Sequence, residues 1–359
     1  MRRQRGRVGL MAAALVGFIA SGAVAEVVTE RSASILVFPK VVADGTRDTV
    51  IQITNTSNSM VHAHCFYTNG ALTFPDLPAG PNNPPLWTEI DFDIWLTKQQ
   101  PTYWLVSEGR LVDPDDDPCT QSDSSCDNSG IDPGRVPPVV GDFTGELKCI
   151  EVDPSGAPLS GNHLKGEATI VTDGDEVEKY NGLGIIGNEN NNGDAVLCLG
   201  GAASASCPNG AEYNACPQTW VLTGYADGAT EPYSGATVDT SITVVPCTEN
   251  FETQVPTSVT IQFGVTNEFE QSFSASTTVT CWAELGLDEI NPVAFSQIGS
   301  TFIQTRMRPS AGTASGFMVV GSESYDDDDG EATASVNLFV EGERTGPDLI
   351  TIPAEQIVQ

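Results

Sequence analysis

The sequence has almost no pattern that indicates a helix. No window of about 11 residues places apolar side chains at the i, i+3, i+4 and i+7 positions of an amphipathic helix. Short segments of alternating apolar and polar residues occur instead, such as Ser34–Lys40 and Glu146–Val152, and Gly, Pro, Asn and Asp separate them. This pattern excludes a helical bundle and predicts an all-β protein of antiparallel sandwich domains with few or no helices.

Basic residues are also scarce. The 359 residues include 16 Lys and Arg against 48 Asp and Glu, which gives a net charge of −32. Four of the basic residues precede residue 26, so the rest of the chain carries 12 basic and 48 acidic residues and a net charge of −36. A surface of this charge repels nucleic acid and anionic lipid and attracts cations such as Ca²⁺. We therefore expect no nucleic-acid partner, and calcium is a candidate ligand.

Long apolar runs are confined to the first 25 residues. Four arginines among the first seven residues form a positive segment, and the apolar stretch Gly9–Val24 leads into the small residues Ala23-Val24-Ala25 of a cleavage site. The apolar stretch is too short for a good membrane span. We predict a signal peptide over residues 1–25, a mature chain without a membrane span, and secretion to the extracellular space or the periplasm.

Catalytic motifs are missing as well. The chain contains no G-x-S-x-G nucleophile elbow. Glycoside hydrolysis needs two placed carboxylates, but 48 acidic residues make any single pair uninformative. These absences favour a non-enzymatic role.

The three histidines of the chain form the sharpest candidate site. His62 and His64 are two residues apart in a strand pattern, so both imidazoles project from one face. His163 lies in the same half of the sequence, at the approach to a later strand. Together the three side chains would suit Zn²⁺ or Cu²⁺. The alternative is that all three are separate surface residues.

A second candidate metal site lies in a loop rich in Pro and Asp. Asp113, Asp115 and Asp117 alternate along this loop. Carboxylate oxygens are the ligands that calcium prefers, so the spacing suggests a weak calcium site. The alternative is an ordinary polar turn.

Nine cysteines in an exported chain indicate a disulfide framework with one cysteine left over. Strand alternation places Cys65 on the same face as Val61, Ala63 and Tyr67, and it places Cys149 on the same face as Leu147. We therefore predict a Cys65–Cys149 bridge across the core. Closing this loop would contribute about 4–5 kcal/mol in the chain-entropy model.

Two further bridges are expected from the positions of the remaining cysteines. Cys119 and Cys126 lie seven residues apart in the Asp-rich loop, and Cys247 and Cys281 are the natural partners in the second half. This scheme leaves one member of a group of three unpaired: Cys198, Cys207 and Cys216.

Length and an internal similarity predict two domains. Ile51-Gln52-Ile53 is matched by Ile261-Gln262-Phe263, and each is followed by Thr-Asn and a later strand with a cysteine beside an aromatic residue. We place the first domain at 26–235, with loop insertions at 111–140 and 173–235, and the second at 236–359. The alternative to a true duplication is that amphipathic strands resemble one another by composition.

Aromatic residues gather in one stretch and offer a third kind of site: Trp87, Trp95, Tyr103 and Trp104. Trp95 lies in an alternating strand and is expected in the core, whereas Trp87 and Tyr103 are the candidates for exposure. Exposed rings in this stretch would form a platform for stacking sugars.

The segment Ile53-Thr54-Asn55-Thr56-Ser57, followed by Val61-His62-Ala63-His64-Cys65, resembles part of the immunoglobulin-like modules of bacterial surface proteins. The resemblance covers about 40 residues in each half and concerns architecture. It implies two immunoglobulin-like sandwich domains and a structural, adhesive or surface-assembly role, with a protein or glycan at a cell surface as partner. A metal-binding domain and a carbohydrate-binding module are the alternatives.

Overall fold

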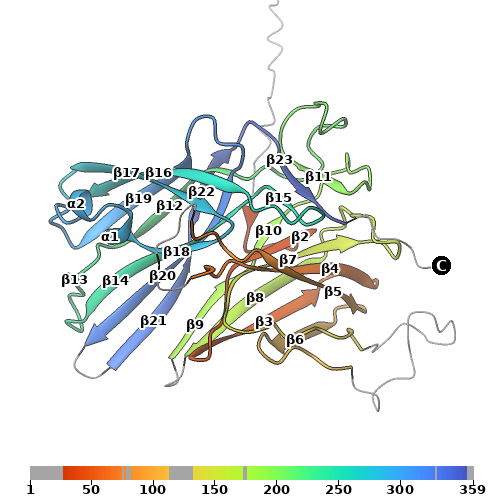
Figure 1. Cartoon of the computed structure of the whole chain (residues 1–359), viewed down its shortest axis with the longest axis horizontal. Coiled ribbons are helices and arrows are strands. Elements are labelled where there is room, and N and C mark those ends of the chain that lie inside the picture. The colour runs from red at the N-terminus through yellow and green to blue at the C-terminus, as the bar shows by residue number, and fades with distance from the viewer. Residues whose placement is uncertain are drawn as a thin grey trace, which may run out of the picture.

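The structure is a computed structural model that describes residues 27–74, 77, 82–112, 132–172, 176–327 and 330–353. Nearly every regular element of this part of the chain is a β-strand (Figure 1). Its helical residues form two four-residue turns, α1 (Leu287–Ile290) and α2 (Pro292–Phe295). The prediction of an all-β fold of antiparallel sheets is confirmed.

The first half of the chain forms one ten-stranded sheet in the order β5-β4-β7-β2-β3-β8-β9, with β6 on β3, β10 on β2 and β1 on β10. Its strands are β1 (Val27–Val28), β2 (Ile35–Ala43), β3 (Arg47–Asn55), β4 (Val61–Asn69), β5 (Thr88–Leu96), β6 (Pro101–Leu105), β7 (Phe143–Val152), β8 (Leu164–Thr172), β9 (Glu176–Asn181) and β10 (Leu183–Ile185). A single residue pair, Ala43 with Asp48, joins β2 to β3. Side chains from both parts of the sheet fill one buried apolar cluster, so the two parts face each other as a sandwich.

The second half forms three smaller sheets. One has the order β17-β16-β19-β12-β22, with β12 (Pro217–Tyr225), β16 (Ser258–Asn267), β17 (Ser272–Thr280), β19 (Phe302–Pro309) and β22 (Phe339–Glu343). Another has the order β13-β14-β20-β21, with β18 on β14: β13 (Ala229–Thr230), β14 (Thr237–Pro246), β18 (Ala283–Gly286), β20 (Phe317–Asp327) and β21 (Gly330–Asn337). The smallest joins β11 (Val196–Leu199), β23 (Asp348–Thr351) and β15 (Glu249–Asn250), and its β15–β23 pair is parallel.

Five strands lie in the range 173–235 that the sequence assigned to an elaboration of the first domain. Two of them, β9 and β10, do pair with strands of the first half. The partners of the other three come later in the chain: β11 pairs with β23, β12 with β19 and β22, and β13 with β14. Alternation along a strand indicates which side chains are buried but not which distant strand it pairs with.

Two apolar clusters fill the molecule. The first lies inside the first-half sandwich and includes the predicted face of β4, namely Val61, Ala63, Cys65 and Tyr67. The second begins on the opposite face of the same strands and continues without a break into the second half. Phe66 of β4 stacks on Phe251 with ring centroids 4.3 Å apart. Because both faces are covered, every residue of β2 and β4 is buried, and the two halves share a core.

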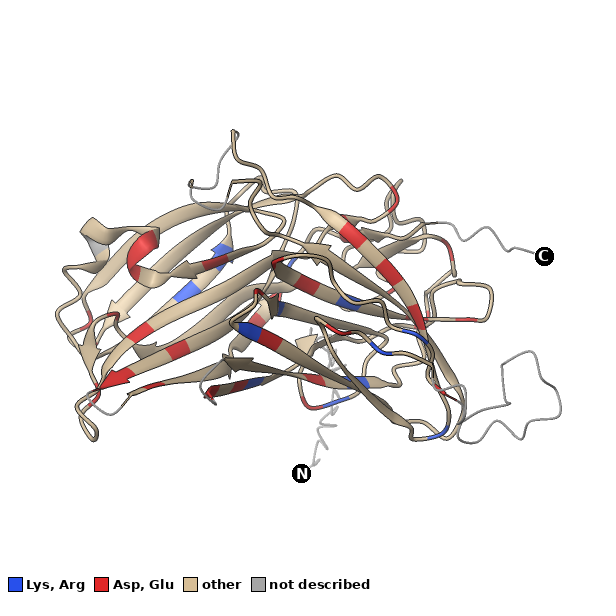
Figure 2. Cartoon of the chain, turned by 60° about the horizontal axis from the view of Figure 1, so that its bottom comes forward, with Lys and Arg blue, Asp and Glu red and all other residues tan. Residues whose placement is uncertain are grey.

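Polar contacts also join the halves. Acidic residues outnumber basic ones along the described ribbon (Figure 2), and buried Lys40 lies among several acids from both halves. Its ammonium is 2.8 Å from Glu178 and 2.9 Å from Glu284. In addition, the indole nitrogen of Trp282 donates to the carbonyl of Pro39 at 2.8 Å.

The two segments that suggested a duplication each end in an asparagine whose side chain makes the same pair of hydrogen bonds. The side-chain oxygen of Asn55 accepts from the amide of Ser57, and its nitrogen donates to the carbonyl of Leu96. Asn267 does the same with the amide of Phe269 and the carbonyl of Ile298. The next strands differ, since β4 pairs with β5 and β7 whereas β17 pairs with β16. The duplication therefore stays a prediction.

Three disulfides are present in the described residues. Cys65–Cys149 is confirmed, but it links directly opposite residues of the adjacent strands β4 and β7 rather than two sheets across the core. Cys198 pairs with Cys207.

The predicted Cys247–Cys281 bridge is wrong, because Cys247 pairs with Cys216. Cys216 immediately precedes β12, and Cys247 immediately follows β14. Both cysteines lie against Gly316: the amide of Cys247 bonds to its carbonyl, and a Cβ on Gly316 would fall 2.9 Å from that of Cys216. Cys281 is a buried free thiol. Cys119 and Cys126 lie outside the described residues.

The described part of the chain contains no helix that is long and apolar enough to cross a membrane.

Candidate functional site

His62 and His64 share one face of β4, as alternation predicts, but that face is buried. His62 Nε2 lies 2.6 Å from Asp93 Oδ1, and its Nδ1 lies 3.0 Å from the carbonyl of Asp153. The ring also stacks on Trp95, with centroids 3.8 Å apart. His64 Nε2 lies 3.1 Å from Asp91 Oδ2, and this hydrogen bond lowers the pKa of Asp91. Each imidazole is therefore held by a carboxylate of the neighbouring strand β5.

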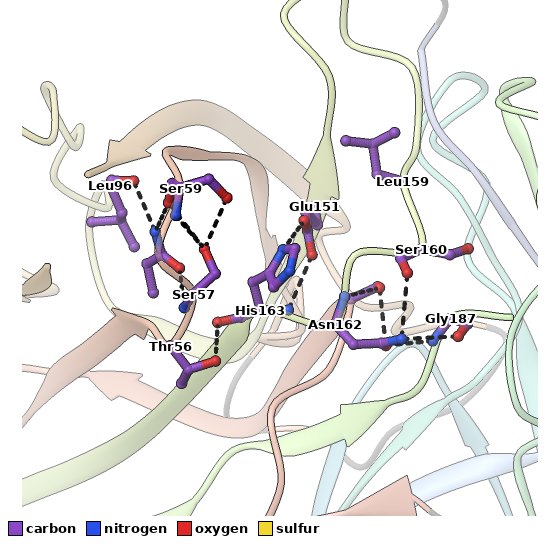
Figure 3. Close-up of polar contacts among 12 residues, drawn as sticks. Thr56, Ser57, Ser59, Leu96, Glu151, Leu159, Ser160, Asn162, His163 and Gly187 are labelled. Atoms are coloured by element: carbon purple, nitrogen blue, oxygen red, sulfur yellow. Dashed lines mark hydrogen bonds and ion pairs between the residues drawn. The ribbon is translucent and has the colours of Figure 1, made fainter. Parts of the chain in front are cut away.

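His163 is held elsewhere, by Glu151 (Figure 3). Its Nδ1 lies 2.7 Å from Glu151 Oε1, and its amide donates to the other oxygen of that carboxylate. Burial raises the pKa of Glu151, although the hydrogen bond from His163 acts in the opposite direction. In the register between β4 and β7, Glu151 lies opposite Ala63. Ala63 stands between His62 and His64 on β4, so Glu151 projects from the face of the sheet opposite to these two histidines. Because alternate side chains point to opposite faces of a sheet, His163 is bound on the other side.

The structure therefore does not assemble the predicted three-histidine site. In the described residues, only one group brings three potential metal-ligand atoms within 4.8 Å of one another: Cys216, Cys247 and Asp348. The two sulfurs of this group are joined in a disulfide, so they cannot act as thiolate ligands. The calcium candidates Asp113, Asp115 and Asp117 lie outside the described residues.

A buried charged cluster occupies the same face of the sheet as His62 and His64. Lys148 Nζ lies 2.5 Å from Glu146 Oε2 and forms a second ion pair with Glu249 of β15. Burial, with the nearby charge of Glu249, raises the pKa of Glu146 well above its usual range. Burial acts to lower the pKa of Lys148, but the two carboxylates outweigh it and raise that pKa. Each side chain is at most 2% exposed, so a substrate has no access and the cluster is a structural junction.

The aromatic stretch is only partly exposed. Trp87 is 5% exposed and packs near Phe251, so its predicted exposure is wrong. Trp104 is buried and donates to Tyr67 Oη at 2.5 Å. Tyr103 is 71% exposed, as predicted, because it alternates on β6 with the buried residues Thr102 and Trp104.

Tyr103 lines a groove of about 530 Å³ on the outer face of β6, β3, β8 and β9. Strand register places Tyr103 opposite Gln52, Gln52 opposite Glu167, and Glu167 opposite Asn181. Adjacent strands lie about 4.8 Å apart, so the row spans about 14 Å. Lys179 lies 2.6 Å from Glu167, at one end of this row.

The row thus combines one exposed ring with two amides and one carboxylate. An aromatic ring can pack against the apolar face of a sugar, while amides and a carboxylate bind its hydroxyls. Alternation alone could indicate that Gln52 and Glu167 point outward. Alternation could not show that these two residues lie beside Tyr103. Their proximity depends on the pairing of strands about 50 to 115 residues apart in the sequence.

In comparisons with known proteins, the chain matches no protein-family model and no curated protein sequence.

Proposed function

We propose that this is a secreted, non-enzymatic protein with an adhesive or surface-assembly role, and that it binds carbohydrate in the groove at Tyr103. The observation that carries the proposal is the row of Tyr103, Gln52, Glu167 and Asn181 across four strands. The ring would stack on one sugar, and the polar side chains would bind hydroxyls of that sugar and the next. The span of about 14 Å suits a short oligosaccharide rather than a single ring.

Binding without hydrolysis is supported by the chemistry of the groove. Glu167 is the only carboxylate among the residues that line it, and Lys179 forms an ion pair with Glu167. Hydrolysis of a glycosidic bond requires two carboxylates placed on either side of the bond. The three histidines are each bound to a carboxylate away from this groove, so none of them supplies a base there.

The fold supports the secreted, immunoglobulin-like part of the proposal. The three disulfides of the described residues suit an oxidising compartment. The first half is a β-sandwich with an enclosed core, which is the broad class of fold to which immunoglobulin-like modules belong. Such sandwiches present binding surfaces on rigid sheets, which is useful in an adhesive protein.

Titration of the mature protein with neutral oligosaccharides, after a screen on a glycan array, tests this proposal. Tyr103→Ala should weaken binding of the selected oligosaccharide at least tenfold, because it removes the stacking surface. Tyr233→Ala is the matched control, since Tyr233 is 98% exposed outside the groove, and it should bind like the parent. Failure to retain any neutral glycan, or equal binding by the Tyr103 variant, would overturn the proposal.

A further inference from the structure

Two arginines stand out on the second-half sheet because that half is almost free of basic residues. Residues 236–359 include only three, Arg306, Arg308 and Arg344. Arg306 and Arg308 are two apart on β19, and the residues on either side of Arg306, Thr305 and Met307, are buried. Both arginines therefore project from the same exposed face of the sheet.

The two guanidinium groups differ in how they are held. Arg306 donates to both oxygens of Glu341 on β22, which fixes its position. Arg308 is exposed, and its guanidinium forms no hydrogen bond or ion pair with the described residues. The guanidinium of Arg308 therefore lacks an acidic partner, although acids greatly outnumber basic residues in this chain, and it lies beside the guanidinium of Arg306.

The arginines line a groove of about 830 Å³ across β17, β16 and β19. Register places Arg308 opposite Gln262 and Gln262 opposite Ser276, while Arg306 faces Gly264 and Gly264 faces Ser274. Besides the two arginines, the exposed lining offers mainly hydroxyl and amide groups.

Gly264 is what makes this face hollow. Its neighbours Phe263 and Val265 are buried, so a side chain at 264 would point outward into the groove. A Cβ built there would meet only the backbone oxygen of Arg306, at 4.0 Å. A glycine inside a strand often marks a place where a ligand approaches the backbone closely.

We propose that this groove binds an acidic saccharide, with its carboxylate or sulfate group on Arg308 and its hydroxyls over Gly264, Ser274 and Ser276. A guanidinium group matches such oxyanions with paired, charge-assisted hydrogen bonds. The lining has few large apolar anchors and is rich in serine, which is depleted at protein interfaces, so a hydroxyl-rich ligand fits it better than a protein surface. The site lies on a different sheet from the Tyr103 groove and does not depend on the proposed function.

The test is calorimetric titration of the mature protein at low ionic strength with three oligosaccharides of equal length: an oligouronate, a sulfated one and a neutral one. The charged probes should bind at least tenfold more tightly than the neutral probe at this site. Tight binding of the oligouronate alone assigns a carboxylate ligand, and tight binding of the sulfated probe alone assigns a sulfate ligand. Equal affinity for all three probes in a protein that carries Tyr103→Ala, where the first groove no longer contributes, would overturn the proposal.

Two variants and one control locate the binding. Arg308→Gln removes the charge without touching the core, and Gly264→Leu fills the hollow; each should weaken the charged probes at least tenfold. Arg135→Gln, at an exposed arginine of the first half, should leave binding unchanged. An equal loss in this control means general electrostatic attraction and refutes the site. The site is also refuted if sedimentation shows a dimer in the parent that Gly264→Leu dissociates, because the face then binds a second copy.

Discussion

Lys148 of β7 and Glu249 of β15 form a buried ion pair that ties the first-half sandwich to the smallest sheet of the second half. Glu146 completes the cluster from the same strand as Lys148. The aromatic pair Phe66 and Phe251 packs beside the same junction, since Phe66 faces Lys148 in the strand register and Phe251 follows β15. The halves are thus joined by charge and by apolar contact at one place.

Removing the ammonium from this junction should be costly. Lys148→Met would leave two buried carboxyl groups without their cation, and we expect it to lower the free energy of unfolding by about 3–5 kcal/mol. Urea unfolding followed by tryptophan fluorescence measures the change. Lys179→Met is the control, because Lys179 is 49% exposed and its ion pair with Glu167 should contribute less than about 1 kcal/mol. A loss of the same small size in both variants would show that Lys148 does not hold the junction.

Stability should increase as the pH falls from about 7 toward 5. Burial raises the pKa of Glu89 to about 7 and that of Asp227 to about 6, so the folded protein keeps protons that the unfolded chain has already lost in this range. A folded state that binds more protons becomes less stable as the pH rises. Thermal unfolding measured from pH 5 to 7.5 should therefore show a falling midpoint.

The variant Glu89→Gln isolates one of these groups. It removes the titrating carboxyl, so the fall in midpoint across this pH range should be shallower than in the parent. Glu108→Gln, at an exposed acid, is the control and should keep the slope of the parent. An unchanged slope in the Glu89 variant would rule out this residue as a source of the pH dependence.

Gly70 should not tolerate a side chain. A Cβ at this position would lie 2.2 Å from the Cβ of Trp282, and Trp282 is held by its hydrogen bond to Pro39. We expect Gly70→Ala to lower the free energy of unfolding by about 1–3 kcal/mol, as for overpacking in a core. Gly264→Ala is a matched control, because that position is open and the change should be nearly neutral. Chemical denaturation of both variants makes the comparison.

The disulfide connectivity can be checked directly. Digestion without reduction should yield linked peptides for Cys216–Cys247 and for Cys198–Cys207. Cys281 is buried, and burial raises the pKa of its thiol, so iodoacetamide should modify it only after unfolding. A linked peptide that contains Cys247 and Cys281, or rapid labelling of Cys281 in the native protein, would contradict the structure.

The candidate sites show where reasoning from the sequence stops. Alternation places His62 and His64 on one face of a strand, and the structure confirms this. It does not indicate that the face is covered by the second half, nor that Glu151 binds His163 on the other face. The same limit applies to the cysteines. The faces of their strands predict the Cys65–Cys149 bridge, but not the partner of Cys216, because β12, the strand that follows Cys216, joins a sheet of the second half.

The sequence by itself determined the all-β class, the excess of negative charge, the exposure of Tyr103, and the shared strand face of His62 and His64. These properties depend on composition and on the two-residue period of a strand, which are local. Only the tertiary structure decided that Tyr103 meets Gln52, that Arg308 meets Gln262, and that the halves share a core around Lys148. Those relationships depend on which distant strands pair and in which register, and that choice is made by the packing of the whole chain.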